Sequence, residues 1–418
     1  MLRRLGALEE IFWLMEHQSD GHFCTAIEIE GNTTPASWRD ALDSVQQRRP
    51  LWAACIRADD EGVPCFYSTK GRRIPLLILD YSSTTDWSSF LVEELSSKFD
   101  ATEAPLLRAV LLWSETRSVV ILTAHHSIED GLSLTLAVRD MLRALGGQTS
   151  AYQEVPPPQD VLMAQLLNRP SSFAVRHRIS QPPSAIIEED DGRRAPMQVR
   201  TLRYSCKFTE DIVGVCSKAG VTVGGLLAAA CCFAVRKLSP VKREDSVAIL
   251  SPVSRRALLD VGETSGLYLG WSRVLFESSE QDPNIWDSAL HASKTWEQSL
   301  SLEAVLASND MACHAVYSGQ AAKMLQANSL RRDVYLSNQG KLPSDSRVGP
   351  LRLVGVWPVA PPGSSTEHRV SAATVNGTLC LTYATYLSDP EFPSMLERVL
   401  CEALDSAHVW GVESIELQ

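Results

Sequence analysis

The sequence predicts a mixed α/β protein built as two lobes, and three observations lead to this fold class. Its 418 residues exceed one ordinary hydrophobic core and suit two lobes of about 150–200 residues each. Segments with the alternating pattern of strands and segments with helical periodicity follow one another in both halves. A proline-broken stretch over residues 154–198 is typical of a linker, which places the first lobe at 1–153 and the second at 199–418.

The first half alternates between short strands and helices. The apolar spacing favours a strand–loop–helix unit in which an apolar strand ends at 124, polar residues follow, and a helix runs to 145 before Gly146-Gly147 ends it. Residues 114–117 join the last two strands as a hairpin. We predict helices over 7–16, 35–47 and 87–99, and strands over 23–29, 51–57, 62–67, 106–113 and 118–124.

The second half shows the same two periodicities. Residues 222–237 form one long apolar stretch that includes Cys231-Cys232, which is typical of a buried helix with small core cysteines. The linker itself contains one short helical piece, residues 161–167. We predict strands over 199–208, 246–252, 334–337, 351–359 and 377–384, and helices over 209–219, 222–237 and 390–404.

Charge and composition argue against several classes of partner. The formal net charge is −11, so we expect no nucleic-acid partner, which would need clustered Lys and Arg. No apolar run approaches the length of a membrane span, and the amino terminus lacks the apolar core of a secretory signal. The ten cysteines form no CxxC pair and no zinc spacing, so we expect no metal and a reducing, cytoplasmic location. We expect a monomer.

The polar segment after residue 124 carries the candidate chemistry. His125 and His126 stand at a strand end, where successive side chains face opposite sides, so only one of them can enter a given cleft. An imidazole can accept a proton near neutral pH and so can act as a general base. Asp130 can orient the imidazole, hold the loop through an arginine, or cap the next helix. Gly131 allows a tight bend and brings its backbone N–H near a reacting oxygen.

The string His125-His126-Ser127-Ile128-Glu129-Asp130-Gly131 resembles the HHxxxDG motif of the condensation-domain and coenzyme-A-dependent acyltransferase superfamily. Weaker similarities appear in the order that this superfamily shows, so the resemblance covers nearly the whole chain. They are Arg48-Arg49-Pro50-Leu51, residues 99–108, the helix over 222–237, Pro252-Val253-Ser254-Arg255-Arg256 and Ser337-Asn338-Gln339-Gly340.

The resemblance implies two lobes like chloramphenicol acetyltransferase, forming a V around a central tunnel. It implies that His126 projects into the tunnel as the catalytic base, with His125 as a structural neighbour. The backbone N–H of Gly131 and the side chain of Asn338 are the candidate donors to the oxyanion, although Asn338 could equally be a turn residue. Asp130 is expected to pair with Arg256 of the second lobe, with Arg255 as the alternative.

The resemblance also implies the substrates. An acyl group would move from an acyl-CoA, or from a phosphopantetheine-bound acyl carrier protein, to a small-molecule alcohol or amine, with no permanently bound cofactor. The DFGWG segment of the plant enzymes is absent, and no carrier domain is fused to the chain, so a stand-alone polyketide-associated or alcohol acyltransferase is favoured. We expect transfer to a hydroxyl of a secondary metabolite. Amide formation, or a condensation-like fold used for binding or other chemistry, remains the alternative.

Overall fold

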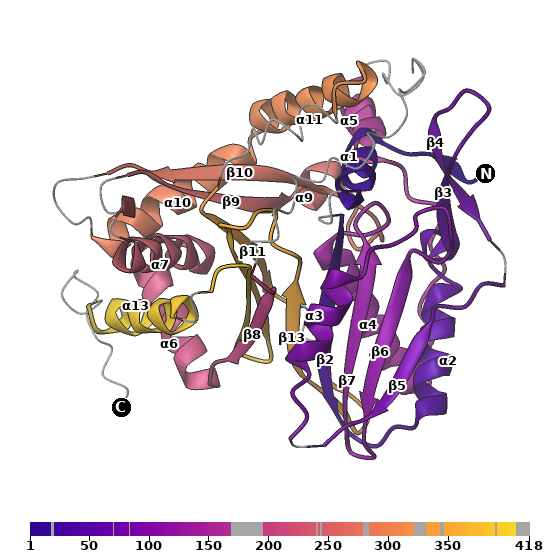
Figure 1. Cartoon of the computed structure of the whole chain (residues 1–418), viewed down its shortest axis with the longest axis horizontal. Coiled ribbons are helices and arrows are strands. Elements are labelled where there is room, and N and C mark those ends of the chain that lie inside the picture. The colour runs from indigo at the N-terminus through magenta and orange to yellow at the C-terminus, as the bar shows by residue number, and fades with distance from the viewer. Residues whose placement is uncertain are drawn as a thin grey trace.

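A computed structural model of the chain describes the two lobes and the segments that join them (Figure 1). It describes residues 1–17, 21–69, 71–82, 84–168, 195–239, 241–242, 245–278, 284–321, 332–342, 347–388 and 391–406. Most of the predicted linker, residues 169–194, lies outside these ranges. Its described part contains the predicted short helix, which is α5 (Gln159–Leu166).

The first lobe is built on a mixed sheet of six described strands. The predicted hairpin over 106–124 is present: its two strands are antiparallel, and the second pairs with the strand that starts at His22. The edge strand β5 was not predicted. In spatial order the strands are β12 (Arg347–Val348), β13 (Leu351–Val359), β2 (His22–Glu30), β7 (Arg117–His125), β6 (Leu107–Trp113) and β5 (Leu76–Asp80).

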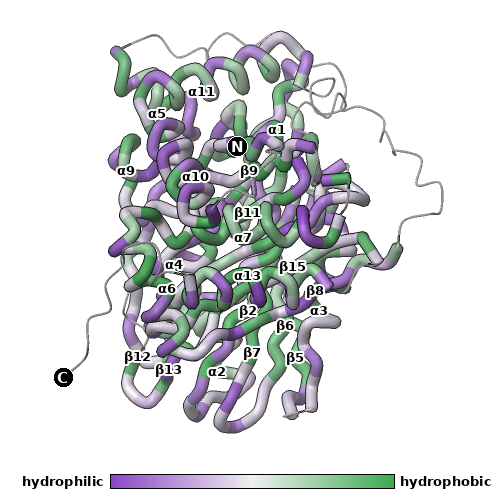
Figure 2. The backbone as a smooth tube through the Cα atoms, turned by 90° about the vertical axis from the view of Figure 1, so that its left-hand side faces the viewer, coloured by the Kyte–Doolittle hydropathy of each residue, from purple (hydrophilic) through white to green (hydrophobic). Residues whose placement is uncertain are grey.

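Alternating side chains of this sheet enter two different cores. One face packs against α2 (Pro35–Gln46) and α4 (Gly131–Leu145), whose apolar stripe supplies the buried leucines of the first core. The other face packs against α3 (Ser88–Ser96) and against strands of the second lobe. Figure 2 shows that the strands β2, β6 and β7 are largely apolar, as burial on both faces requires.

The second lobe has a sheet of six described strands covered by helices. α7 (Val223–Leu238) packs at its centre between α10 (Ile285–Ser299) and α13 (Phe392–Ser406), and it includes the buried Cys231 and Cys232. Its strands, in spatial order, are β10 (Leu269–Phe276), β9 (Val247–Ser254), β11 (Val334–Lys341), β14 (His368–Val375), β15 (Thr378–Thr385) and β8 (Gln198–Arg203). The shorter helices of this lobe are α6 (Cys206–Lys218) and α9 (Arg256–Leu259).

The two lobes exchange one segment, which departs from the predicted division at residues 199–418. Strand β13 belongs to that range by sequence, yet it pairs antiparallel with β2 of the first sheet, with Val359 beside Cys24. Its apolar residues are buried in the first core and in the core between the lobes. The chain therefore enters the first sheet at β13 and then returns to the second lobe, where it forms β14 and β15. In the first sheet, β13 pairs with the side of β2 that does not pair with β7.

Helix α1 (Ala7–Glu16) connects the lobes at the upper end of the molecule in Figure 1. It packs against α11 (Leu302–Tyr317) and, through Leu8 and Phe12, against Leu267 and Leu269 at the start of β10. The N-terminal strand β1 (Arg3–Arg4) leads into it. A small separate sheet contains β1, β4 (Pro64–Ser68) and β3 (Ala54–Ala58), which follows a 3-10 turn over Pro50–Ala53.

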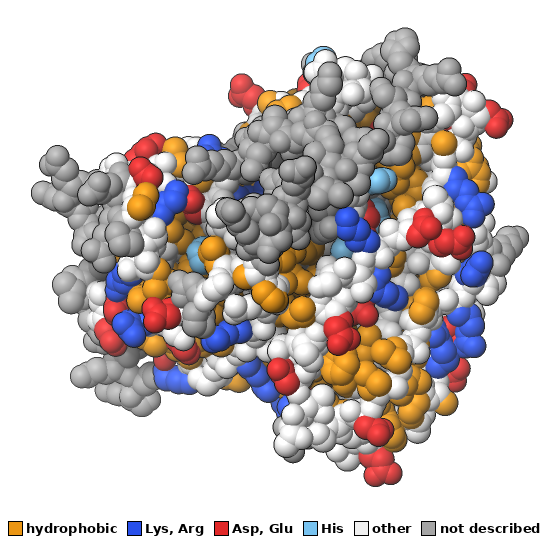
Figure 3. All heavy atoms as spheres, in the orientation of Figure 1, with side chains coloured by type: hydrophobic (Ala, Val, Ile, Leu, Met, Phe, Trp, Pro, Cys, Tyr) orange, Lys and Arg blue, Asp and Glu red, His pale blue; other side chains and the backbone are white. Residues whose placement is uncertain are grey.

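The surface and the helices show two further features. In Figure 3, acidic and basic side chains are interspersed, and hydrophobic side chains gather over strands β5 and β6, where Leu77 and Ile78 are exposed. No single helix within the described ranges has the length and hydropathy to cross a membrane. The pair α6 and α7 meets those criteria only jointly, and the chain bends by 101° between them.

Candidate active site

The histidine motif lies on the predicted strand–loop–helix unit. Strand β7 ends at His125, and α4 begins at Gly131. Asp130 is the N-cap of α4, since its side chain accepts a hydrogen bond of 2.7 Å from the N–H of Ser133. The loop between strand and helix is therefore short, and its two ends are held by regular structure.

His126 lies between two aromatic rings at the wall of a cavity. Its imidazole stacks on Phe23 of β2 at 4.1 Å between centroids and lies 4.4 Å from the ring of Phe12 on α1. Both phenylalanines line the same cavity as His126. These contacts hold the ring in one orientation; the sequence did not single out either phenylalanine.

The hydrogen bonds of His126 define its tautomer. Nδ1 lies 3.1 Å from the backbone oxygen of Glu129, and because a carbonyl only accepts, Nδ1 carries the proton. Nε2 then holds the free lone pair. Burial lowers the pKa of His126 to about 3, the bond to the Glu129 carbonyl opposes this shift, and the positive charge of Arg369 adds to it. The imidazole is neutral at physiological pH and can accept a proton at Nε2.

His125, the last residue of β7, is not among the residues that line the cavity of His126. It is fully buried, its ring meets the ring of Phe99 edge-on at 6.1 Å, and its Nδ1 accepts a hydrogen bond from the N–H of Ser127. Burial lowers the pKa of His125 to about 4. His22, to which the sequence assigned no role, is its neighbour on β2 and forms a buried pair with Glu16 at 2.8 Å.

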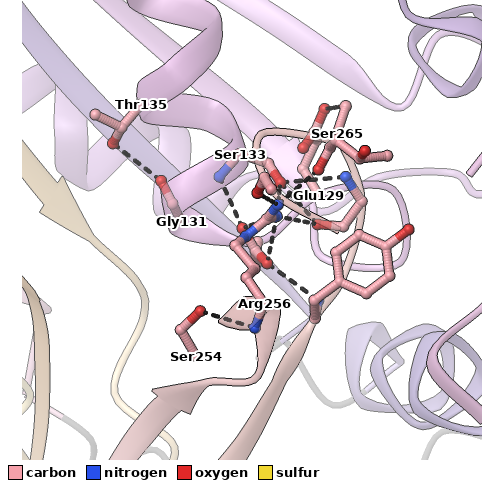
Figure 4. A network of polar contacts seen from close by, with 12 residues as sticks. Glu129, Gly131, Ser133, Thr135, Ser254, Arg256 and Ser265 are labelled. Atoms are coloured by element: carbon pink, nitrogen blue, oxygen red, sulfur yellow. Dashed lines mark hydrogen bonds and ion pairs between the residues drawn. The ribbon is translucent and has the colours of Figure 1, made fainter. Parts of the chain in front are cut away.

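Asp130 contacts the second lobe through a buried network (Figure 4). Its carboxylate oxygens lie 3.1 and 2.9 Å from Nη2 of Arg256, and one of them also accepts the N–H of Tyr268 at 3.0 Å. Arg256 also donates to the backbone oxygens of Gly262 and Thr264. Within the described part of the chain, Asp130 makes no hydrogen bond to His126. Asp130 therefore links the two lobes and also caps α4.

The two adjacent arginines at the end of β9 point to different places. Arg255 is also buried, but its Nη2 donates to Ser308 of α11 at 3.0 Å, and its guanidinium packs against Gly270. A Cβ on Gly270 would lie 2.0 Å from that nitrogen, so the residue at 270 must be small. Burial lowers the pKa of Arg255 to about 10.

Asn338 and Gly131 both line the cavity of His126. The Oδ1 of Asn338 accepts the N–H of Gly340 at 2.9 Å, which gives the side chain a turn-forming contact and leaves Nδ2 as its donor group. Gly131 is the first residue of α4, where backbone N–H groups have no partner within the helix. Both residues therefore border the cavity, and Nδ2 of Asn338 also lies close to Gly224 of α7, where an added Cβ would approach within 3.2 Å.

Gln339 is a site residue that sequence reasoning missed. Its Oε1 accepts a hydrogen bond of 2.7 Å from Thr135 of α4, which ties β11 of the second lobe to the first. Its Nε2 lies close to Gly131, where an added Cβ would approach within 2.6 Å. The "SNxG" pattern could have signalled this position, since Gln339 is the variable residue within it. Adjacent residues on a strand point to opposite faces, so Asn338 and Gln339 can contact different parts of the protein.

Glu129 provides a second missed feature directly beside the base. Its side chain is fully buried, accepts hydrogen bonds from Trp52 and Ser265, and leaves Oε2 without a hydrogen-bond partner in the described structure. Burial raises the pKa of this carboxyl. Glu129 therefore anchors the loop whose backbone oxygen orients His126.

The cavity lies between the lobes, opens to solvent and has a volume of about 140 Å³. Both lobes line it, and no cluster of three potential metal ligands occurs in the described ranges. Strands β9, β11 and β14 of the second lobe and the end of β13 of the first sheet contribute to its lining. The lining residues from these segments are Pro252, Val253, Ser254, Tyr335, Ser337, Asn338, Gln339, Pro358, Val359, Arg369 and Ser371.

Comparisons with known proteins agree with this fold. Residues 12–165 match the family model of the condensation domain. The sequence is 23% identical over 245 residues to gramicidin S synthase 2 of Brevibacillus brevis and to the protein of that name in Aneurinibacillus migulanus. The match takes in 53% of this chain but spans only 5% of the length of each relative.

Solved structures share the fold over nearly the entire chain. Polyketide synthase associated protein 5 from Mycobacterium tuberculosis is 16% identical, with a TM-score of 0.67 over 97% of this chain and 98% of its own. The first condensation domain of the calcium-dependent antibiotic synthetase is 15% identical, with a TM-score of 0.67 over both complete chains. The epimerization domain of tyrocidine synthetase B is 13% identical, with a TM-score of 0.66 over 98% and 96%.

Proposed function

We propose that this protein transfers an acyl group from a CoA or carrier-protein thioester to a hydroxyl group of a small-molecule acceptor. The observation that carries the proposal is the neutral imidazole of His126, whose Nδ1–H is held by the Glu129 carbonyl while Nε2 remains unprotonated at a cavity lined by both lobes. The condensation-domain fold supports a thioester as the donor.

The proposed reaction follows from this geometry. Nε2 of His126 takes the proton of the acceptor hydroxyl while its oxygen attacks the thioester carbon, and a tetrahedral oxyanion forms. The N–H of Gly131 and Nδ2 of Asn338 are the proposed donors to that oxyanion. When the carbon–sulfur bond breaks, the imidazolium returns the proton to the leaving thiolate. Asp130 and Arg256 hold the lobes in register during these steps.

The test is an incubation with acyl-CoAs and acyl carrier proteins of several chain lengths, offered matched alcohol and amine acceptors. Mass spectrometry would follow the acylated acceptor, and a thiol reagent would follow the released thiol. We expect ester products, with no product from His126→Ala at an unchanged melting temperature. Products with amines alone would replace the ester proposal by amide formation. Full activity of His126→Ala would exclude the general-base role.

A further inference from the structure

A segment of the second lobe, residues 262–268, lies against the histidine loop of the first lobe. It lies between α9 and β10 in the chain, and we call it the bridging segment. Figure 4 shows its Ser265 beside Glu129. The N–H and the oxygen of Gly266 both form hydrogen bonds with the hydroxyl of Ser133 on α4, at 3.1 and 2.8 Å. The bridging segment is therefore held against the residues that follow His126 in the sequence.

One peptide group joins the bridging segment to the catalytic base. The carbonyl oxygen of Glu129 accepts the hydrogen bond of 3.1 Å from Nδ1 of His126. The N–H of the same peptide group belongs to Asp130 and donates to the oxygen of Gly266 at 3.0 Å. A peptide group is planar, so the direction of its N–H fixes the direction of its carbonyl, and each hydrogen bond in such a chain strengthens the next. The second lobe therefore orients the carbonyl that holds the proton of His126.

The side chains on either side of this peptide group also contact the bridging segment. The carboxyl group of Glu129 accepts a hydrogen bond from Oγ of Ser265. The carboxylate of Asp130 accepts the N–H of Tyr268 at 3.0 Å. Glu129, Asp130 and Ser265 are buried, so leaving one of these polar groups without its partner is costly. Three residues of the bridging segment thus fix one peptide group of the histidine loop.

The carboxyl group of Glu129 acts as a hydrogen-bond acceptor in this arrangement. Its Oε1 accepts from Nε1 of Trp52 at 2.5 Å as well as from Ser265. Burial raises the pKa of Glu129, and the positive charge of Arg49 opposes that rise. Glutamine presents a similar carbonyl oxygen without a charge, whereas alanine presents none. Glutamine at this position should therefore keep more of the contact with the bridging segment than alanine does.

We infer that the bridging segment positions the catalytic base: through the Glu129–Asp130 peptide group it keeps the proton of His126 on Nδ1, so that Nε2 can accept a proton while the lobes are in contact. The hydrogen bond made by one nitrogen of a neutral imidazole decides which nitrogen carries the proton. With its proton on Nε2, the ring could not accept the proton of an acceptor hydroxyl there. Ser265 and Gly266 are positioning residues, because they do not line the cavity. The inference rests on the proposed function for the role of His126 as the base.

Nitrogen-15 NMR of the protein labelled at its histidine rings measures the tautomer without any substrate. The signals of His126 are those that disappear in His126→Ala, and in the unmodified protein we expect a single tautomer with the proton on Nδ1. Gly266→Ala should mix the two tautomers. Its φ of 151° is one that L side chains rarely adopt, and a Cβ there would lie 2.9 Å from the ring of Tyr268, so the carbonyl that holds the peptide group must move. Ser265→Ala should also mix them, and it serves if Gly266→Ala fails to fold, since it removes a hydroxyl without straining the backbone.

The rate of acyl transfer should change together with the tautomer. In Ser265→Ala, kcat should fall about tenfold with KM changed less than about twofold, because the base is displaced while the cavity lining is kept. Glu129→Gln should lie closer to the unmodified protein than Glu129→Ala in both tautomer and kcat. The matched control is Glu263→Gln, which removes another contact of the bridging segment, the exposed pair with Arg139. It should leave the tautomer and kcat unchanged.

The outcomes separate this inference from its alternatives. A proton on Nε2 of His126 in the unmodified protein overturns it, and so does a single Nδ1 tautomer in both Gly266→Ala and Ser265→Ala. An equal change of tautomer in Glu263→Gln also overturns it, because any disturbance of the contact between the lobes would then suffice. If the tautomer responds as expected but no thioester supports acyl transfer, only the proposed function fails.

Discussion

Asp130 of the first lobe and Arg256 of the second meet in a buried ion pair, with Nη2 of Arg256 3.1 and 2.9 Å from the two carboxylate oxygens. The same carboxylate caps α4, the helix that follows the histidine loop. One side chain thus couples the position of the loop to the contact between the lobes. A change at either residue should be felt in stability as well as in rate.

Asp130→Asn should lower the stability of the protein. Asparagine still caps the helix, but it leaves Arg256 buried without a counter-charge, which costs about 3–5 kcal/mol when a buried pair is broken. The matched control is Glu263→Gln, which breaks the Arg139–Glu263 pair between the same two segments at an exposed site. Such a pair contributes about 0–1 kcal/mol. Thermal and urea unfolding would check both; equal melting temperatures for the two variants would contradict a structural role for Asp130.

The pH dependence of the acyl-transfer rate should differ from that of an enzyme whose catalytic histidine has an ordinary pKa. The base works as the neutral imidazole, which predominates at every pH above its pKa, and burial lowers that pKa to about 3. A histidine with the ordinary pKa of about 6.5 would lose roughly thirtyfold in rate by pH 5. We expect a single-turnover rate that changes less than about threefold between pH 8 and 5, with folding checked at each pH. A decline in the single-turnover rate centred near pH 6.5 would show that His126 is protonated with the ordinary pKa of a histidine.

Asn338→Asp separates the two roles of Asn338. Aspartate can still accept the N–H of Gly340, so the turn is kept, but the Nδ2 donor is lost. If Nδ2 stabilises the oxyanion, kcat should fall about 10²–10³-fold in both Asn338→Asp and Asn338→Ala. Melting temperatures should fall only for alanine. Near-normal kcat for the aspartate variant would assign Asn338 to the turn alone.

Gly131→Ala should impair transfer by displacing Gln339. The new Cβ would lie 2.6 Å from Nε2 of Gln339, the far end of a flexible side chain, so we expect the protein to fold with that side chain moved. Alanine keeps the backbone N–H, so a fall in kcat/KM of about 10–100-fold would come from altered geometry at the cavity. Gln339→Ala in the Gly131→Ala background should restore part of the rate. Additive losses in the double variant would exclude this coupling.

The sequence predicted most of the helices and strands in the first lobe because their periodicity is local. It placed the motif between a strand and a helix, and it required His125 and His126 to diverge because strand side chains alternate. It did not anticipate β5, β10, β14, α10 or α11. Their patterns are shorter or more mixed, and burial against distant segments decides their conformation.

The local order around His126, from the end of β7 to the capped start of α4, was determined by the sequence alone. The tertiary structure decided which distant residues complete the site. It brought Arg256 to Asp130 and Arg255 to Ser308, placed β13 in the first sheet, and placed Gln339 and Arg369 at the cavity wall. The contacts of Arg256, β13 and Gln339 join segments more than 100 residues apart, and Arg255 and Ser308 are 53 residues apart. Such contacts depend on how whole sheets and helices pack, and no local pattern of residues encodes that packing.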